Sequence, residues 1–397
     1  MTRKRWLILA LPLILMMSCA APLAWPFQPT ATPTSTSTPT PLPTATATPT
    51  PLPTPTPVPA ARVGSGDQAL FEGDYDHAQQ EYQTALDETT DQDVKAAAYI
   101  GLAQVQIDQG NDAASLTTLR TVIDQYPQSS HIARAYFFLA QTYSALDRYT
   151  EAAQAYDNYL QANPGIIDSY VYGLKGDALY AAGDYGGAIT AYQSAINAPH
   201  LDNNLQYEVK KARATADGGN FLAAVDQYNT IYLTAQDDYL KAQMDLLSGQ
   251  IYLALGNPDT AYNYFMDAVV NYPKAYDSYT ALVSLVNAGV PVSDLSRGLV
   301  DYFVGKYSLA LDAFNRYIDA TPDHDGTVDY YKALTLTQLN NYDGAIQVWD
   351  DLITNFPDDR FWVSAWDEKA YTQWVYLEKY DDAAQTLLDF VDRVPND

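Results

Sequence analysis

Apolar residues recur along most of this chain with the spacing of one face of an α-helix. Ala152, Tyr156 and Tyr159 stand four and three residues apart, and Pro164 follows them. Residues at these intervals share one side of a helix, whereas a proline cannot continue a helix. Each such pattern therefore predicts an amphipathic helix that packs through its apolar side and ends close to the proline.

The pattern repeats with a period of about 36 residues, and successive copies are separated by 37, 37, 36, 36, 37, 49, 35 and 38 residues. Self-similarity at this length predicts an array of helix pairs, because one pair cannot bury its apolar face alone. A small residue begins each copy, which suits a point where two helices cross closely. It stands at nine positions: Ala78, Ser115, Ala152, Ala188, Ala224, Ala261, Ala310, Ala345 and Ala383.

A short polar turn precedes most of these small residues. Gly73-Asp74 and Gly183-Asp184 are two examples, and Asn341 stands at the corresponding place in another copy. Glycine favours the left-handed conformation that ends a helix, and Asp or Asn favours the N-cap that begins the next one. The turns therefore predict where the first helix of each pair ends and the second begins.

The first helix of each pair has a pattern of its own, shown by Tyr136, Leu139, Ala140 and Tyr143. Together the two helices resemble the tetratricopeptide repeat (TPR) family, whose motif places Trp, Leu, Gly and Tyr in the first helix and Ala, Phe, Ala and Pro in the second. The resemblance covers roughly residues 65–397, although we find no Trp at the first position. It implies an all-α fold, a right-handed α-solenoid of about nine helix pairs.

The 49-residue interval predicts an insertion between the sixth and seventh repeats. A helix over Ala275–Ala288, ended by Gly289, accounts for the additional length. We therefore expect repeats 1–6 in residues 63–274, the inserted helix in residues 275–292 and repeats 7–9 in residues 293–397.

The N-terminal segment has the order of charged and apolar residues that is typical of signal peptides. A basic run at residues 3–5 precedes an apolar run at residues 6–17, which is too short to span a bilayer. Ser18 then precedes Cys19, the single cysteine of the chain. This arrangement resembles the lipobox of bacterial lipoproteins, which implies removal of residues 1–18 and attachment of lipid to Cys19. The alternative is an ordinary secretory signal peptide with an incidental cysteine.

Residues 19–62 are expected to form a linker, since residues 28–59 are mainly proline and threonine, with some serine, alanine and leucine. Such a segment cannot bury a core and stays extended, close to polyproline II. We expect a disordered stalk that holds the repeats away from the outer face of a bacterial membrane, in an extracellular or periplasmic location. The membrane would be contacted through the lipid on Cys19.

The chain is strongly acidic, with 22 Lys and Arg against 48 Asp and Glu and a formal net charge of −26. A surface of this charge repels nucleic acid and anionic lipid, so we expect no nucleic-acid partner. Either a well-solvated surface or cationic partners account for the charge.

Two surfaces are candidates for binding. In a solenoid of helix pairs the first helices line the concave face, and the TPR resemblance implies that the residue after each small first-helix residue points into the groove. We expect an envelope protein or peptide to bind there. Near the C-terminus, Leu388 and Val391 form an apolar face without a capping helix, so either a partner docks on them or the native chain continues. The candidate groove residues are Gln104, Gln141, Asp177, Arg213, Gln250, Leu299, Leu334 and Tyr371.

The sequence offers no catalytic or metal site. The four histidines are scattered, and none has a partner at the spacing of metal ligands. Residues 298–306 lack the spacing of a phosphate-binding loop, and Asp323–Gly326 lacks the acid that completes a calcium loop. We therefore expect a non-catalytic protein that needs no cofactor and no metal.

Two further resemblances bear on function. Residues 126–136 resemble TPR lipoproteins associated with outer-membrane assembly and cell division, which are interaction scaffolds. We therefore expect a lipid-anchored, exported TPR scaffold for protein–protein interactions in the cell envelope. Residues 298–307 and 357–359, with Trp366, are similar to the helical N-terminal arm of soluble lytic murein transglycosylases. The alternative is thus the N-terminal solenoid of a peptidoglycan lytic transglycosylase whose catalytic domain is missing from this chain. Capture of solutes or glycans by Tyr and Trp is a third, weaker hypothesis.

Overall fold

The computed structural model describes residues 58–165, 167–199 and 204–394. Within these residues the chain forms nineteen α-helices and one π-helical turn, η1 (Thr372–Tyr376), and no β-strand. The predicted signal peptide, the predicted lipid on Cys19 and most of the predicted linker fall outside the described residues. None of the described helices has the length and hydropathy needed to cross a membrane.

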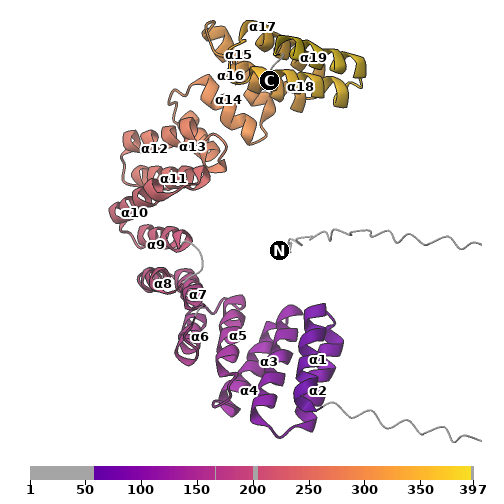
Figure 1. Cartoon of the computed structure of the whole chain (residues 1–397). Coiled ribbons are helices and arrows are strands. Elements are labelled where there is room, and N and C mark those ends of the chain that lie inside the picture. Colours follow the sequence, from indigo (N-terminus) through magenta and orange to yellow (C-terminus); the bar gives the residue numbers. More distant parts are fainter. Residues whose placement is uncertain (1–57, 166, 200–203, 395–397) are drawn as a thin grey trace, which may run out of the picture. The chain divides into compact units, whose positions relative to one another are not determined.

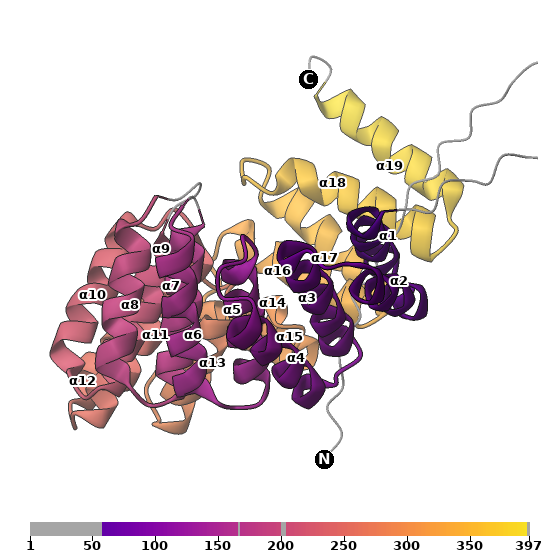
Figure 2. The same cartoon turned by 90° about the horizontal axis from the view of Figure 1, so that it is seen from below.

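Consecutive helices pack against each other in chain order and form nine pairs (Figures 1 and 2). We call the first helix of each pair helix A and the second helix B. One further helix, α13, stands between the sixth and seventh pairs, so the predicted all-α fold of nine pairs with one inserted helix is confirmed. The helices A are α1 (Pro59–Glu72), α3 (Gln92–Asp108), α5 (Ile132–Ala145), α7 (Asp168–Ala181), α9 (Leu205–Asp217), α11 (Asp238–Ala254), α14 (Asp294–Phe303), α16 (Gly326–Gln338) and α18 (Trp362–Tyr371); the helices B are α2 (Tyr75–Glu88), α4 (Asp112–Gln125), α6 (Tyr149–Ala162), α8 (Tyr185–Asn197), α10 (Phe221–Thr234), α12 (Pro258–Asn271), α15 (Tyr307–Ala320), α17 (Tyr342–Asn355) and α19 (Tyr380–Arg393); the inserted helix is α13 (Tyr276–Asn287).

The array begins earlier than the sequence suggests. Helix α1 starts at Pro59, so residues 59–62, which the sequence assigns to the linker, are helical. A proline in the first turn is compatible with a helix, because the first backbone N–H groups have no partner within the helix. Val63 and Ala69 of α1 are buried against the next helices.

The small residue of each repeat lies where the two helices of a pair meet. Eight of the nine are fully buried, and Ala383 is nearly so. Ser115 is accommodated because its hydroxyl oxygen lies 3.3 Å from Thr142 Oγ1, within hydrogen-bond distance. The burial of these positions agrees with a close helix crossing, at which a larger side chain would separate the helices.

The turn between helices A and B uses one left-handed residue in every pair. Glycine occupies it in six pairs, as at Gly183 (φ 79°), whereas Asp147, Asn340 and Glu378 occupy it in the other three. The next residue is the N-cap of helix B, and Asp184 shows its role by accepting a hydrogen bond from Gly187 N at 2.9 Å. The predicted left-handed turn is confirmed, whereas the predicted side-chain N-cap forms in five of the nine helices B and is absent at Asn220.

The ninth pair contains one additional residue. The small residue of helix A stands eight residues before the N-cap of helix B in the first eight pairs, but Ala370 stands nine residues before Lys379. The π-helical turn η1 lies between them and accommodates the extra residue, as single π-turns do within α-helices.

The inserted helix α13 packs as the helix A of a further pair would. It contacts α11 and α12 of the sixth pair, and its Ala281, Leu282 and Leu285 are buried in one cluster with Phe265. No helix B follows it, because α14 begins after a short segment and starts the seventh pair.

Candidate functional site

We define the helix-A face as the eight residues that directly follow the small residues of the second to ninth helices A. On the first half of this face the polar side chains contact neighbouring repeats. Gln104 Oε1 accepts a hydrogen bond from Arg134 Nη2 at 2.6 Å, and both residues belong to consecutive helices A. Gln141 is half-buried on α5. Gln104 is therefore already engaged with the next repeat.

Asp177 is also engaged with other parts of the array. Its carboxylate accepts hydrogen bonds from Lys210 Nζ at 2.8 Å and from the Tyr192 hydroxyl at 2.9 Å. Nearby, the Tyr180 hydroxyl donates to the carboxylate of Asp217. These contacts connect α7 to α9, so polar residues on this part of the face join successive repeats.

Arg213 and Gln250 differ from these residues. Both are exposed, on α9 and α11, and neither has a hydrogen bond or ion pair with another residue of the described chain. Burial raises the pKa of the Tyr228 phenol to about 12, and the positive charge of Arg213 opposes that rise. Burial also raises the pKa of Asp277, which Arg213 again opposes. An exposed cation thus stands among phenols and a carboxyl group.

The second half of the face is mostly packed into the protein. Leu299 lies against the cluster around Phe314, and Leu334 lies against the cluster around Trp349, so both are half-buried. Tyr371 is exposed, and its ring centroid lies 5.8 Å from that of Tyr376. The free side chains of the helix-A face are therefore few, with Arg213 and Gln250 at its centre.

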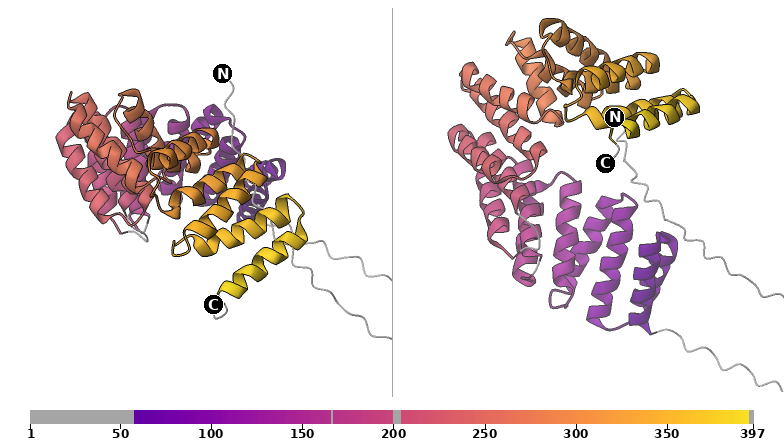
Figure 3. Two further views of the ribbon diagram at one scale, coloured as in Figure 1. Left: turned by 90° about the horizontal axis from the view of Figure 1, so that it is seen from above. Right: turned by 45° about the horizontal axis from the view of Figure 1, so that its top comes forward.

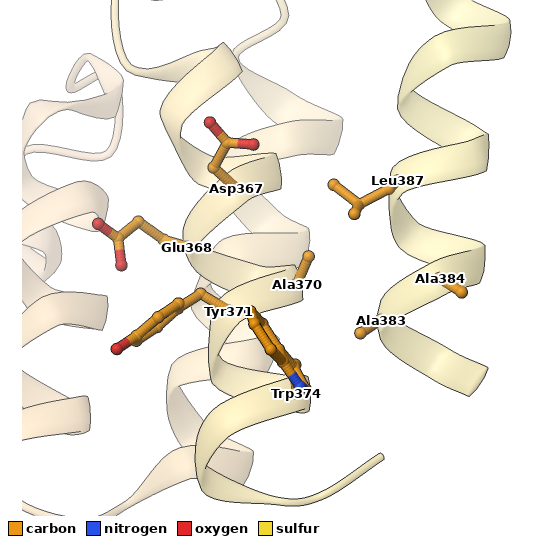
Figure 4. Close-up of a pocket in the computed structure, with 8 residues that line it drawn as sticks. All are labelled: Asp367, Glu368, Ala370, Tyr371, Trp374, Ala383, Ala384 and Leu387. Carbon is orange, nitrogen blue, oxygen red and sulfur yellow. The ribbon is translucent and has the colours of Figure 1, made fainter. Parts of the chain in front are cut away.

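An apolar groove, which we call the C-terminal groove, lies between α18 and α19 and has a volume of about 480 Å³. Figure 4 shows Leu387 and Ala383 pointing from α19 toward α18, while Glu368 and Tyr371 point away from α19. The pKa of Glu368 is raised, mainly because its carboxyl group is partly buried and secondly because of the negative charge of Asp367. The groove is lined by Asp367, Glu368, Ala370, Tyr371, Trp374, Ala383, Ala384 and Leu387.

Leu388 and Val391, the candidate docking residues of the last helix, are both exposed on α19. Leu388 directly follows Leu387 of the groove, and Val391 lies one turn further along the same helix. Their exposure extends the apolar surface of the groove along α19.

The sequence reasoning did not find a buried carboxyl group, Asp245, that lies beside the half-buried Asp267. Asp245 on α11 is only 4% exposed, and its Oδ2 has no hydrogen-bond partner. The pKa of Asp245 is raised to about 8, mainly because the carboxyl group is buried and secondly because of the negative charge of Asp267. Asp245 lines a cavity of about 280 Å³ with Asn229, Tyr232, Asn263, Tyr264 and Asp267.

The position of Asp245 within its repeat could have indicated this cavity from the sequence. Asp245 stands four residues before the small residue Gly249, where Tyr99, Tyr136 and Tyr172 stand in other helices A. An aspartate is smaller than a tyrosine and leaves space between the helices. The hydrogen bond that the Asp267 carboxylate accepts from the Tyr232 hydroxyl, at 2.8 Å, fixes the other side of this space.

Within the described parts of the chain, no three His, Cys, Asp or Glu residues are placed to hold a metal ion. The two carboxylates of the Asp245 cavity thus lack the further acidic or histidine ligand that a protein metal site generally uses.

Four models of the tetratricopeptide repeat match the chain, over residues 69–136, 133–166, 244–275 and 295–360. These segments hold helices A and B of the pairs described above. The chain carries tetratricopeptide repeats. Repeats of this kind build scaffolds for protein–protein interaction, and the matches contain no catalytic domain.

Among characterised proteins, a TPR repeat-containing protein of Methanocaldococcus jannaschii is 26% identical over 223 residues, which is 56% of this chain. The matched part is 38% of that relative's length. Similar solved structures include PilF of Pseudomonas aeruginosa, with 17% identity, a TM-score of 0.38 and coverage of 57% of this chain and 97% of that one. YrrB, described as a TPR protein with an unusual peptide-binding site, has 19% identity, a TM-score of 0.40 and coverage of 51% and 97%.

Proposed function

We propose that this TPR protein is an exported, lipid-anchored scaffold that binds other cell-envelope proteins on its helix-A face. The observation that carries the binding site is the pair Arg213 and Gln250. Both are exposed on consecutive helices A of the array, and both lack a partner among the described residues. Hydrogen-bonding groups that the fold does not use remain free to bind an acceptor or donor of another protein.

The charges around the site indicate which residues a bound segment should contain. Arg213 is a planar, permanently charged donor that suits a carboxylate, and Gln250 offers both a donor and an acceptor to a peptide backbone. The chain is otherwise strongly acidic, with a net charge of −26. We therefore expect an extended segment with one acidic residue for Arg213 and neutral or basic residues around it.

The binding site is tested by comparing proteins that copurify with the full-length chain and with a variant carrying Arg213→Glu and Gln250→Ala. The same set of envelope proteins should be lost from the variant. The control carries Leu233→Asp, at an exposed position of helix B α10, and should retain them. Equal recovery of these envelope proteins with all three chains would show that the helix-A face does not bind them.

The export and anchoring rest on the sequence of residues 1–19. We propose cleavage after Ser18 and lipid attachment to the Cys19 thiol, which would hold the repeats at the outer face of a membrane. Cys19→Ala should move the protein from the membrane fraction to the soluble fraction. Membrane association that survives this substitution would contradict lipid anchoring.

The intact mass of the native protein separates this scaffold from the lytic transglycosylase alternative. The scaffold predicts a mass close to the 43.8 kDa of the chain, reduced by loss of residues 1–18 and increased by lipid. A native protein heavier by ~15–20 kDa, the size of one additional domain, would favour the transglycosylase.

A further inference from the structure

At the internal pairs, helix B packs against the next helix A, and α12 of the sixth pair packs against the inserted helix α13. At the eighth pair, Trp349 of α17 is fully buried in a cluster that includes Ala365 and Trp366 of α18. Trp362 of α18 also donates its indole N–H to the Ile353 carbonyl at 3.0 Å. The surface of one pair is therefore built to receive a helix.

The ninth pair presents the corresponding surface uncovered. Leu387 stands at the position of Trp349, eight residues after the N-cap of helix B, and is 44% exposed. Val391 corresponds to Ile353, and the two are 56% and 4% exposed. Among the described helices, the main contacts of α19 are with α18 and η1. Figure 2 shows α18 and α19 next to each other, and Figure 3 shows the same C-terminal end, in yellow, from two further sides.

Two apolar features distinguish the ninth pair from most of the others, although Leu119 and Met266 show that each occurs once elsewhere. An aromatic residue occupies the position of Leu387 in seven of the other eight pairs, so the shorter side chain leaves the 480 Å³ groove open. Leu388 occupies a position that is polar in seven of the other eight pairs, including Asp350 of the eighth pair. The apolar surface is thus wider here than in the internal repeats.

The groove also contains an acid in an unusual place. Asp367 stands three residues before the small residue of its helix A, where the other eight pairs carry an apolar residue or glycine. Its carboxylate is exposed beside Ala370 in the close-up of Figure 4. A helix that covers this position would have to supply a positive charge, because burying an unpaired carboxylate is costly.

The cations of the ninth pair do not serve this purpose. Lys369 pairs with Asp350 at 2.7 Å, and Lys379 Nζ lies 3.6 Å from an Asp343 carboxylate oxygen. The Arg393 guanidinium lies over the Trp366 ring, at 5.4 Å from its centroid. All three point to other groups, so the charge for Asp367 must come from the bound helix.

We propose that the C-terminal groove binds one α-helix of a partner protein, with small and aliphatic residues along its contact face and a Lys or Arg opposite Asp367. The bound helix takes the place that α18 takes on the eighth pair. A second copy of this chain is a poor occupant, because two copies each carry a net charge of −26. The groove shares only Tyr371 with the helix-A face, and the proposal stands independently of the proposed function.

The test uses the full chain and a display library of helical peptides. Each peptide has about 18 residues, or ~27 Å of helix, with apolar residues at i, i+3, i+4 and i+7. The flanking positions are varied among Lys, Arg, Gln and Glu. Selection should enrich peptides that contain Lys or Arg, and circular dichroism should show the bound peptide to be helical.

Three variants locate the binding site for a selected peptide. Leu387→Asp should weaken binding by about tenfold or more, because it places a charge in the apolar contact. Asp367→Lys should reverse the selection toward Glu, a readout that partial unfolding would not produce. Leu233→Asp, at an exposed position on α10, should bind as the parent chain does.

Enrichment of acidic peptides by the parent chain, or binding that Leu387→Asp leaves unchanged, would overturn the proposal. Sedimentation of the parent chain and the intact mass of the native protein test two other occupants. A dimer that Leu387→Asp dissociates would assign the groove to a second copy, and a native protein heavier by about one domain would assign it to a following segment of the same chain. Either result would overturn a partner helix. The Arg213→Glu and Gln250→Ala variant should bind the selected peptide as the parent chain does. A negative result for binding at the helix-A face therefore does not affect the test of the C-terminal groove.

Discussion

The ring of Phe265 lies so close to Gly249 that a Cβ atom added to this glycine would stand 2.3 Å from Phe265 Cε1. The two residues belong to helices A and B of the sixth pair, and the Phe265 side chain is fully buried. The absence of a side chain on α11 therefore allows the phenylalanine ring to occupy the crossing of the pair.

We predict that Gly249→Ala destabilises the array. The added methyl group must displace a fully buried ring, and such overpacking costs about 1–3 kcal/mol. Thermal unfolding followed by circular dichroism should show a lower midpoint. The matched control is Gly64→Ala on α1, because a Cβ at Gly64 meets no atom within 4 Å. That control should be neutral or slightly stabilising, since alanine favours helix more than glycine does; an equal loss in both variants would contradict the packing argument.

Glu378 precedes the last helix with a φ of 55°, a left-handed conformation that costs a residue with a side chain about 1–2 kcal/mol. We predict that Glu378→Gly stabilises the ninth pair, although the greater freedom of glycine in the unfolded chain offsets part of the gain. Hydrogen exchange of α19 amides should become slower. The control is Gly183→Ala, which forces a side chain into the same conformation at φ 79° and should destabilise its pair.

We predict that the buried Asp245 makes stability depend on pH. Its pKa of about 8 in the folded chain exceeds the ordinary value of ~3.9 for an unfolded chain. Between these values the folded state keeps a proton that the unfolded state releases, so the free energy of unfolding falls as pH rises from about 4 to 8.

Asp245→Asn should flatten this pH dependence and raise stability at pH 8, because the buried amide remains neutral at every pH in this range. Thermal midpoints of the variant and of the parent chain are compared at about pH 5 to 8, between the two pKa values. The exposed Asp226→Asn on α10 serves as control and should follow the parent profile. A variant that loses stability equally at all these pH values would show that burial of Asp245 has no such effect.

The uncovered side of α19 should also affect the rate of amide hydrogen exchange in this helix. Because fewer contacts hold it, we predict faster amide exchange in α19 than in α17, whose Trp349 is fully buried. A peptide bound in the C-terminal groove should slow exchange in α19 and leave the distant helix α4 unchanged. Slow exchange in α19 without any peptide would mean that the last pair is already as well packed as the internal ones.

The sequence predicted the repeats because the features that define them are local. The nine small residues and the left-handed turns depend on short intervals that recur along the chain, and Asp or Asn stands at the N-cap in six of the nine helices B. The prediction that no Trp occupies the first position of the motif was wrong, since the buried Trp366 stands four residues before Ala370. Counting back from Ala383 with the usual interval reaches Asp367 instead, because η1 adds one residue that the apolar pattern does not reveal.

The candidate sites were less predictable, because they depend on side chains brought together from different repeats. Gln104 is bonded to Arg134, and Asp177 to Lys210, across about thirty residues of sequence. The period places each residue on a face but does not say which neighbour it contacts. The boundary at Pro59 was missed for a local reason, since a proline suits both a linker and a first helical turn.

Photo-cross-linking in living cells tests the proposed function most directly. A photoreactive residue is placed at Arg213 or Gln250 on the helix-A face, and at Val270 as an exposed control site on helix B α12. We predict adducts with the same envelope proteins from both helix-A positions and none of those adducts from Val270. Adducts that form only from Val270, or no adduct from either helix-A position, would contradict a scaffold that binds through its helices A.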